Sequence, residues 1–235
     1  MNYRGISIPF TQMGNVTSDN LFDPNEQVIF DFYEANRSRY RRAIDIGANL
    51  GVHSILMARN GWEVAAFEPD PEHFARLVEN IAAHGCRVLP IQAAVSDRAG
   101  VAEFVRVLDN TTASHLAGAR PHYGPTETIT VAMVDCRPLM AWADFAKIDC
   151  EGHEATLIGA ADIRVWDNLE ALLEVGSPAA AQSIYDRLIG VVPLYAQKIG
   201  WARVMNFADM PTCHQEGSLF IGGKSTFCNV TPRLG

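Results

Sequence analysis

The segment AIDIGANLGVHSILMARNG, residues 43–61, decides the fold. Its first residues, AIDIG (43–47), are an apolar run that ends in glycine, and they predict a short buried strand. GVHSILMARNG (51–61) has the length and apolar content of a helix, and Gly61 closes it, because glycine adopts the left-handed conformation common at helix ends. The segment therefore predicts a strand that turns directly into a helix.

The same rhythm continues after residue 61. EVAAFEPD (63–70) predicts a second strand, and PEHFARLVENIAAHG (71–85) predicts a helix that begins at proline and ends at glycine. RVLPIQAAV (87–95) predicts a third strand. Because strands and helices that alternate in this way form βαβ units, we expect an α/β fold with a parallel sheet covered by helices on both faces.

The rhythm is interrupted after residue 100. VAEFVRV (101–107) and ETITVAMV (127–134) alternate in the manner of antiparallel strands, and a polar loop connects them. We therefore expect an inserted β-hairpin and loop over residues 101–134, between the third and fourth strands of the sheet. Later strands are predicted at 145–149, 169–175, 191–200 and 217–223, and later helices at 153–161 and 179–190.

Residues 1–42 predict a helical lead-in, because NEQVIFDFYEANRSRY (25–40) places its apolar residues at helical spacing. The sequence contains no internal repeat and no clear linker. We therefore expect residues 1–235 to form a single domain.

Composition limits the class of protein. The net charge of −8 argues against a sequence-independent grip on nucleic acid or on anionic lipid. The five cysteines are odd in number and form no CxxC pair, which favours reduced thiols in a cytoplasm. We see neither a signal peptide nor a run of about twenty apolar residues that would span a membrane. We expect a cytoplasmic protein without a nucleic-acid or membrane partner; a homodimer is compatible with the sequence.

The glycines of DIGANLG (45–51) indicate a nucleotide site at the first strand-to-helix turn. Glycine lets the backbone approach a ligand closely, and a helix start offers free N–H groups. Glu68 strengthens this interpretation, because an acid about 20 residues beyond such a turn holds ribose hydroxyls. A dinucleotide fold has a second glycine where this sequence has Asn49, and Asp45 suits a cationic group such as the ammonium of S-adenosylmethionine. The residues therefore favour S-adenosylmethionine over NAD.

The chain resembles the FkbM-type S-adenosylmethionine-dependent methyltransferases over roughly residues 20–175. The motifs that carry the resemblance are DIGANLGVHS (45–54), FEPDP (67–71), AAVSDRAG (93–100), ASHL (113–116) and KIDCEGHEATLIGA (147–160). The resemblance implies a class I methyltransferase (Rossmann-like) fold with a seven-stranded sheet of order 3-2-1-4-5-7-6. It also implies O-methylation of a hydroxyl on a sugar, a polyketide or another small metabolite, with S-adenosylmethionine as the cofactor.

Position by position, the resemblance implies two groups of cofactor-binding residues. Those around the methionine end of the cofactor are Asp45, Gly47, Asn49 and Gly51. Those near the ribose and the adenine are Glu68, Pro69, Asp70, Ala94, Val95 and Ser96. On the acceptor side the chain departs from the family pattern. There His115 follows Ala113 and Ser114 where two serines are common, and the residues after Glu174 are unlike the family.

IDCEGHEA (148–155) places several ionisable groups at the end of the fourth predicted strand. The strand order reverses between strands 1 and 4, so this segment faces the crevice where ligands bind. His153 is the first candidate for a general base, because the pKa of a free histidine lies near neutrality. Glu151 or Asp149 would orient it or the acceptor; alternatively, the two acids only cap the following helix. Glu154 is expected to face solvent or to interact with the helix dipole.

Three further residues, His115, His214 and Glu174, are candidates for contact with the acceptor. His115 lies in the inserted loop, and His214 precedes the last strand in a region that covers the acceptor in this fold. Asp149, Glu151 and His153 are also of the ligand types that hold Mg²⁺ or Mn²⁺, but only Glu174 offers a further ligand from the next strand. The number of ligands therefore does not favour a metal site.

Several functions stay open from the sequence. The leading hypothesis is an O-methyltransferase that acts on a small molecule, and an N-methyltransferase on the same fold is the nearest alternative. An NAD-dependent oxidoreductase is disfavoured by Asn49. A cofactor-binding protein without catalytic activity is the remaining alternative.

Overall fold

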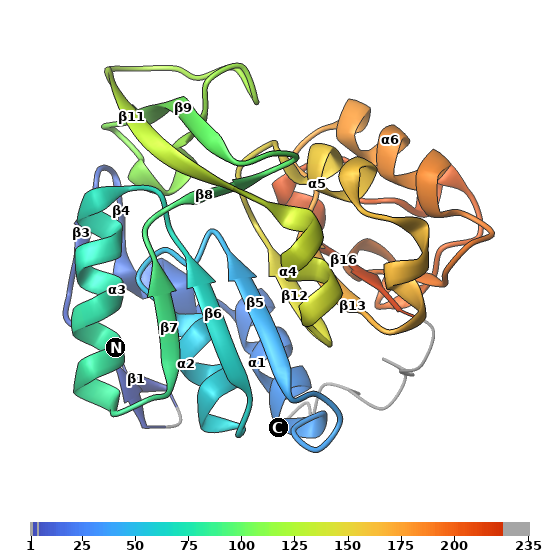
Figure 1. Ribbon diagram of the computed structural model, residues 1–235, viewed down its shortest axis with the longest axis horizontal. Helices are drawn as coiled ribbons and strands as arrows, with labels where there is room; N and C mark the ends of the chain where they lie inside the picture. Colours follow the sequence, from blue (N-terminus) through green and yellow to red (C-terminus); the bar gives the residue numbers. More distant parts are fainter. Residues whose placement is uncertain (1, 4, 223–235) are drawn as a thin grey trace.

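The central sheet has eight strands within the described residues. The computed structural model describes residues 2–3 and 5–222 (Figure 1). From one edge to the other the sheet contains β15 (Ala202–Arg203), β14 (Leu194–Ala196), β16 (Ser218–Ile221), β13 (Glu170–Glu174), β12 (Phe145–Ile148), β5 (Arg42–Ile46), β6 (Glu63–Phe67) and β7 (Val88–Ile91). The five strands from β13 to β7 are parallel, whereas β16 is antiparallel to both β13 and β14. The mixed sheet agrees with an α/β class I methyltransferase fold.

The predicted number of strands is too small by one. The eighth strand is β15, a pair of residues that adds to β14 at the edge of the sheet. Residue 223, the last of the predicted final strand, lies outside the described residues.

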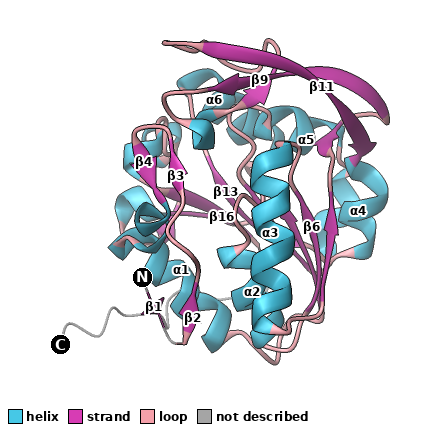
Figure 2. Cartoon of the chain, turned by 90° about the vertical axis from the view of Figure 1, so that its left-hand side faces the viewer, coloured by secondary structure: helices cyan, strands magenta, loops and turns pink. Residues whose placement is uncertain are grey.

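Helices cover both faces of this sheet (Figures 1 and 2). One face packs against α1 (Pro24–Ala35), α2 (Val52–Arg59) and α3 (Pro71–His84). The other face packs against α4 (Cys136–Trp142), α5 (Glu154–Ala160) and α6 (Pro178–Leu188). Alternate residues of β5 supply the two cores, since Ala43 belongs to the first and Ile44 to the second.

Local sequence explains where α3 begins and ends. The Asp70 carboxylate accepts hydrogen bonds from the backbone N–H groups of Glu72 and His73, and Pro71 is the first helical residue. Gly85 ends the helix with a φ of 59°. The helix therefore starts directly beyond the carboxyl end of β6, where Glu68 lies.

The inserted segment forms a second sheet. Its strands lie in the order β10 (His115–Leu116), β9 (Gly100–Val107), β11 (Thr126–Asp135) and β8 (Ala94–Ser96). β9 and β11 make the long antiparallel ribbon at the top of Figure 1. The predicted third strand, 87–95, is in fact divided, because β7 stays in the central sheet while β8 pairs with β11.

The lead-in differs from a purely helical one. Before α1 the chain forms two small hairpins, β1 (Asn2–Tyr3) with β2 (Ile6–Ser7), and β3 (Gln12–Met13) with β4 (Val16–Thr17). Short 3₁₀ helices lie at Ser18–Phe22, Thr111–Ala113, Ile163–Asp167, Gln197–Ile199, Phe207–Asp209 and His214–Glu216. Within the described part of the chain, every helix is too short or too polar to cross a membrane.

Candidate active site

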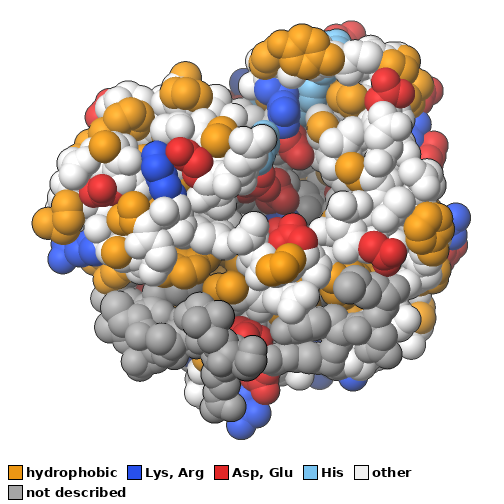
Figure 3. Space-filling view, turned by 180° about the vertical axis from the view of Figure 1, so that it is seen from behind, with side chains coloured by type: hydrophobic (Ala, Val, Ile, Leu, Met, Phe, Trp, Pro, Cys, Tyr) orange, Lys and Arg blue, Asp and Glu red, His pale blue; other side chains and the backbone are white. Residues whose placement is uncertain are grey.

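A cleft of about 510 Å³ opens at the carboxyl ends of the central strands. Figure 3 shows a hollow in this face of the molecule, with acidic side chains deep inside it. The strand order reverses between β5 and β12, and ligands of open α/β sheets bind at such a point. The predicted site residues that line the cleft are Gly47, Asn49, Glu68, Pro69, Ala94, Val95, Asp149, Glu151, Glu174 and His214.

The glycine turn after β5 is shaped by its neighbour strand. Gly47 has a φ of 78°, and a Cβ there would lie 1.7 Å from the carbonyl oxygen of Asp149. Glycine is therefore required so that the ends of β5 and β12 can come together. Asn49 follows with a φ of 51°, a conformation that asparagine tolerates better than most residues, and its buried side-chain oxygen has no hydrogen-bond partner among the described residues.

Glu68 lies at the end of β6 beside this turn. Its two carboxylate oxygens accept hydrogen bonds of 2.8 Å from the backbone N–H groups of Asn49 and Asp70. Burial raises the pKa of Glu68 to about 8 in spite of these bonds. Since a carboxylate oxygen accepts more than one hydrogen bond, Glu68 keeps acceptor capacity toward the cleft.

Four of the predicted cofactor residues do not line the cleft. Asp45 is fully buried and accepts a hydrogen bond from Ser54. Gly51 packs against α3, because a Cβ there would lie 2.5 Å from a methyl carbon of Leu77. The other two are buried and engaged elsewhere: Asp70 pairs with Arg106 at 2.7 Å, and Ser96 contacts His153 at 2.9 Å. These four therefore support the walls of the site.

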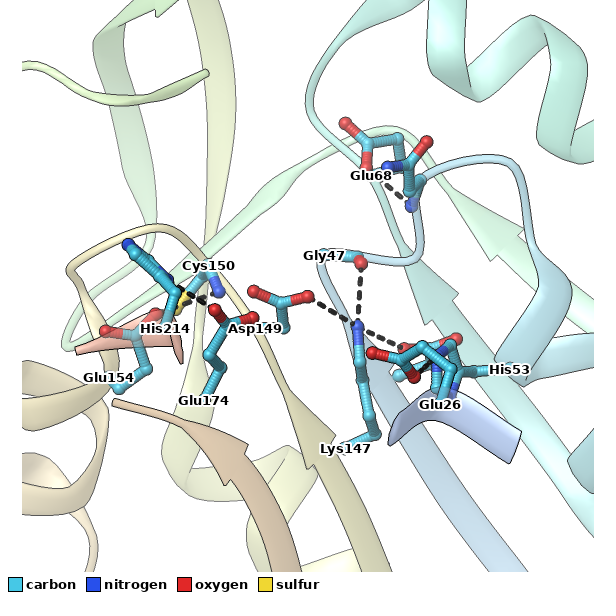
Figure 4. Close-up of polar contacts among 12 residues, drawn as sticks. Glu26, Gly47, His53, Glu68, Lys147, Asp149, Cys150, Glu154, Glu174 and His214 are labelled. Carbon is cyan, nitrogen blue, oxygen red and sulfur yellow. Dashed lines mark hydrogen bonds and ion pairs between the residues drawn. The ribbon is translucent and has the colours of Figure 1, made fainter. Parts of the chain in front are cut away.

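Lys147 contacts two residues that line the cleft, Gly47 and Asp149, and the sequence prediction missed it. Its ammonium lies 3.1 Å from the Asp149 carboxylate and 3.3 Å from the Gly47 carbonyl oxygen (Figure 4). It also lies 3.9 Å from the Asp45 carboxylate. Burial alone would lower the pKa of Lys147, but the carboxylates of Asp149 and Asp45 raise it above its ordinary value. A lysine within the otherwise apolar buried strand FAKI (145–148) was the available signal.

Three carboxylates meet at the other end of the cleft. Asp149 follows β12, Glu151 lies in the next turn and Glu174 ends β13. Arg120 from the inserted loop contacts Glu151, and His214 contacts Glu174 through Nδ1. Glu151 has a φ of 55°, which is unusual for a residue with a long side chain and marks a constrained turn.

The pKa values of these acids differ because their partners differ. Burial would raise the pKa of Asp149, but the ammonium of Lys147 lowers it below its usual value. Burial and the charge of Asp149 raise the pKa of Glu151 to about 8 and that of Glu174 to about 7. The hydrogen bond that His214 donates to the Glu174 carboxylate raises the pKa of His214. One acid is thus held ionised, while the others exchange protons near neutrality.

The structure does not bring His153 into the cleft. His153 precedes α5, and its Nε2 lies 2.9 Å from the Ser96 hydroxyl. Burial lowers its pKa. Glu154 does not face solvent, since it is 1 % exposed and accepts hydrogen bonds from the N–H groups of Cys150 and Gly152. Glu154, rather than Asp149 or Glu151, therefore ties the loop to the start of α5.

His115 and His53 each contact other residues of the fold. His115 is buried outside the cleft lining, with Nδ1 2.9 Å from the carbonyl oxygen of Ala113. His53 lies between Tyr33, 2.9 Å from its Nδ1, and Glu26, 3.0 Å from its Nε2. Glu26 also lines the cleft, so the lead-in helix α1 contributes a wall that sequence reasoning did not identify.

A metal site does not emerge from the side chains in residues 5–222. Nowhere in that range are three His, Cys, Asp or Glu side chains grouped so that they would hold an ion. The carboxylates of Asp149, Glu151 and Glu174 instead have cationic or imidazole partners from the chain, namely Lys147, Arg120 and His214.

Comparison with known proteins gives the family. The family model of the methyltransferase FkbM domain matches residues 45–183, more than half of the chain. Hexuronic acid methyltransferase AglP of Haloferax volcanii is 28% identical over 120 residues, which are 48% of this chain and 47% of that protein. The match thus spans about half the length of this curated relative.

The solved structures that resemble this chain share little sequence identity with it. The N-terminal domain of human METTL16 has a TM-score of 0.48 and 14% identity, with 94% of this chain and 76% of that one covered. An S-adenosylmethionine-dependent methyltransferase from Agrobacterium tumefaciens has a TM-score of 0.44 and 11% identity, with 85% and 61% covered. The match of the family model, which begins at the glycine turn and includes the acid-rich turn after β12, shows that the chain belongs to the FkbM methyltransferase family.

Proposed function

We propose that this protein transfers a methyl group from S-adenosylmethionine to a hydroxyl of a small metabolite, with sugars as the first class to test. The observation that carries the proposal is the continuity of the cleft. One end is formed by the glycine turn and Glu68, the other by Asp149, Glu151 and Glu174. A volume of about 510 Å³ is in the range of small-molecule sites.

The residues present fit the cofactor. Glu68 would accept hydrogen bonds from the ribose hydroxyls, and the unpartnered side-chain oxygen of Asn49 would accept one further donor. Gly47 keeps its side of the cleft free of a side chain. S-adenosylmethionine supplies a methyl carbon on a positively charged sulfur, and the acidic floor of the cleft is complementary to that charge.

The proposed acceptor class follows from chemistry and from the relative. An alcohol is a weak nucleophile, so its methylation needs a group that removes the hydroxyl proton. The acids beyond the glycine turn offer such groups. The similar Haloferax protein is named for hexuronic acid, a sugar acid. We therefore propose a sugar hydroxyl as the acceptor, with Glu151, Glu174 and His214 beside it.

An amine acceptor is the second candidate, and the acid cluster is the observation that favours it. Three carboxylates in one cleft would also hold a cationic ammonium group. The product separates the two candidates, since a methyl on oxygen and a methyl on nitrogen have different ¹³C chemical shifts.

The test is turnover on a defined panel. The purified protein is incubated with S-adenosylmethionine labelled with ¹³C in the methyl group, and with D-glucuronic acid, D-galacturonic acid, D-glucose or an amino sugar. We expect S-adenosylhomocysteine and an O-methylated product above the acceptor-free control. Binding of the cofactor without turnover on any of these acceptors would contradict the proposal and favour a binding protein without catalytic activity.

A further inference from the structure

We propose that Glu174 is the general base of the reaction, and that His214 is the residue that positions Glu174 and passes its proton to solvent. The inference rests on the function proposed above and names the group that performs its proton transfer. It replaces His153 in that role, because His153 lies outside the cleft lining and contacts Ser96.

The position of Glu174 carries the argument. It is the last residue of β13, whose neighbour β12 leads directly into Asp149. Its side chain lines the cleft and lies between Asp149 and His214 in Figure 4. A hydroxyl bound on the acidic floor near Asp149 therefore lies beside the Glu174 carboxylate.

The pair with His214 is built into the fold. His214 begins the 3₁₀ helix His214–Glu216, and its Nδ1 contacts an oxygen of the Glu174 carboxylate. Gly176 makes room for the ring, because a Cβ at that position would lie 3.1 Å from a ring carbon of His214. Nε2 makes no hydrogen bond to any residue in 5–222, and the side chain is 39% exposed, so a proton has a route to solvent.

Asp149, Glu151 and Glu174 have different environments, which separates their roles. Asp149 is paired with the Lys147 ammonium and is a weak base. Glu151 is paired with Arg120, which holds its carboxylate. Glu174 pairs with His214, whose ring can lose its positive charge, whereas Lys147 and Arg120 stay charged. The pKa of Glu174, about 7, suits a base that works near neutrality.

The charged groups that face Glu174 come from three segments. Asp149 and Lys147 belong to β12 and its end, Glu151 to the following turn, and His214 to the last 3₁₀ helix. Burial and Asp149 raise the pKa of Glu174, whereas the hydrogen bond with His214 lowers it. A change of His214 should therefore raise the pKa of the base.

The step balances as follows. The oxygen–hydrogen bond of the acceptor breaks and its proton goes to Glu174, while the acceptor oxygen forms a bond to the methyl carbon. The bond between that carbon and sulfur breaks, and its electron pair stays on sulfur. A sulfonium, a hydroxyl and a carboxylate thus become a thioether, a methyl ether and a carboxylic acid. Nδ1 of neutral His214 then accepts the proton of Glu174, and the proton on Nε2 leaves to solvent, so that Glu174 is again a carboxylate.

The experiment compares Glu174→Gln, Glu174→Asp and His214→Phe with His153→Gln as the matched control. The probe is the sugar of the panel that the unchanged protein turns over fastest. Glu174→Gln should lower kcat about 100-fold or more, because general-base catalysis contributes roughly that factor. Calorimetric affinity for S-adenosylmethionine should change less than twofold. Glu174→Asp should restore part of kcat, and His153→Gln should leave kcat unchanged.

Two readouts separate catalysis from a structural role. In His214→Phe, which keeps a ring and lacks a donor, the acidic limb of the pH profile of kcat should move to higher pH, since the hydrogen bond that lowers the pKa of Glu174 is gone. In NMR titrations of ¹⁵N-histidine, the pKa of His214 should fall in Glu174→Gln. A Glu174→Gln protein with wild-type kcat, or an unmoved pH profile and unmoved His214 titration, overturns this inference alone. Absence of turnover by the unchanged protein on every sugar overturns the proposed function instead.

Discussion

At the scale of single residues, Lys147 connects the stability of the protein to its site. The ammonium lies between Asp149 and the fully buried Asp45. Its removal would leave both carboxylates without their cation. We expect Lys147→Met to lower the free energy of unfolding by about 3 to 5 kcal/mol, the cost of breaking a buried ion pair. Denaturant unfolding measures this loss.

Lys198 provides the matched control. Its ion pair with Glu216 is also short, at 3.0 Å, but both side chains are more than a quarter exposed. Lys198→Met should therefore cost much less than Lys147→Met, because water screens an exposed pair. Equal losses in the two variants would show that the buried position of Lys147 has no special role.

Glu68 gives the cofactor site a pH dependence. Burial raises the pKa of Glu68 to about 8, so below that pH the free protein carries it largely protonated. Ribose hydroxyls donate to a carboxylate, so cofactor binding should favour the ionised form and release a proton at pH 7. The affinity for S-adenosylmethionine should rise from pH 6 to pH 8 and then level off above pH 8.

Calorimetry in buffers of different ionisation enthalpy measures both the affinity and the released proton. Glu68→Gln is the control, because the amide keeps the shape of the side chain and cannot titrate. Its weaker affinity should be nearly flat between pH 6 and pH 8. An unchanged slope in Glu68→Gln would assign the proton to another group of the cleft.

Most cofactor-side residues that line the cleft could be predicted from the sequence, as could Glu151, Glu174 and His214, whereas the pairs that the acids form could not. Gly47, Asn49 and Glu68 follow from a local motif, a turn after a strand and an acid after the next strand. The pairs Glu151–Arg120 and Glu174–His214 join residues 31 and 40 positions apart, and only the folded chain shows which ions meet. His153 has the right pKa for a base as a free residue, but the turn at Gly152 directs it toward Ser96.

At the scale of elements, the buried ion pair of Arg106 and Asp70 connects β9 of the inserted ribbon with the start of α3. Arg106 of β9 is 8% exposed and lies 2.7 Å from Asp70, which also caps α3. We expect Arg106→Met to lower the free energy of unfolding by about 3 to 5 kcal/mol, because Asp70 is left buried without its cation. Chemical denaturation followed by circular dichroism measures the change.

The exposed pair of Arg137 and Asp135 is the control, with the same types of residue and a 2.7 Å contact. Arg137→Met should change the stability much less. Cofactor affinity in Arg106→Met, measured where the protein is folded, should fall only modestly, because Asp70 does not line the cleft. A large loss of affinity with unchanged stability would instead favour the direct role for Asp70 that the sequence predicted.

The elements themselves follow the apolar pattern closely, with exceptions that have tertiary causes. The ribbon predicted at 101–107 and 127–134 is β9 and β11, because alternation of side chains is a local property of a half-buried strand. The run 87–95 looked like one strand, yet residues 88–91 pair with β6 and residues 94–96 pair with β11. Apolar periodicity shows that a segment is a strand and says little about which partner it takes.

At the scale of the whole molecule, the cleft joins parts of the chain that are far apart in sequence. The lead-in supplies Glu26, the inserted loop supplies Arg120 and the last 3₁₀ helix supplies His214, all around the turns that follow β5 and β12. A ligand that fills this cleft therefore contacts the lead-in, the inserted loop, the ends of the central strands and the last 3₁₀ helix together. Its binding should stabilise the whole domain against unfolding.

This coupling allows a test of which nucleotide the protein binds. S-adenosylhomocysteine at about 100 times its Kd should stabilise the fold by about 2.7 kcal/mol and raise Tm by roughly 5 to 10 °C. NADH should leave Tm unchanged, because its pyrophosphate would meet the Asn49 side chain where dinucleotide folds have glycine. The negative charges of Asp149 and Glu26 in the same cleft also oppose a pyrophosphate.

Asn49→Gly is the informative variant: if it gains a Tm response to NADH while keeping that to S-adenosylhomocysteine, the side chain of Asn49 sets the choice of nucleotide. A rise in Tm with NADH in the unchanged protein would contradict this account of the cofactor site.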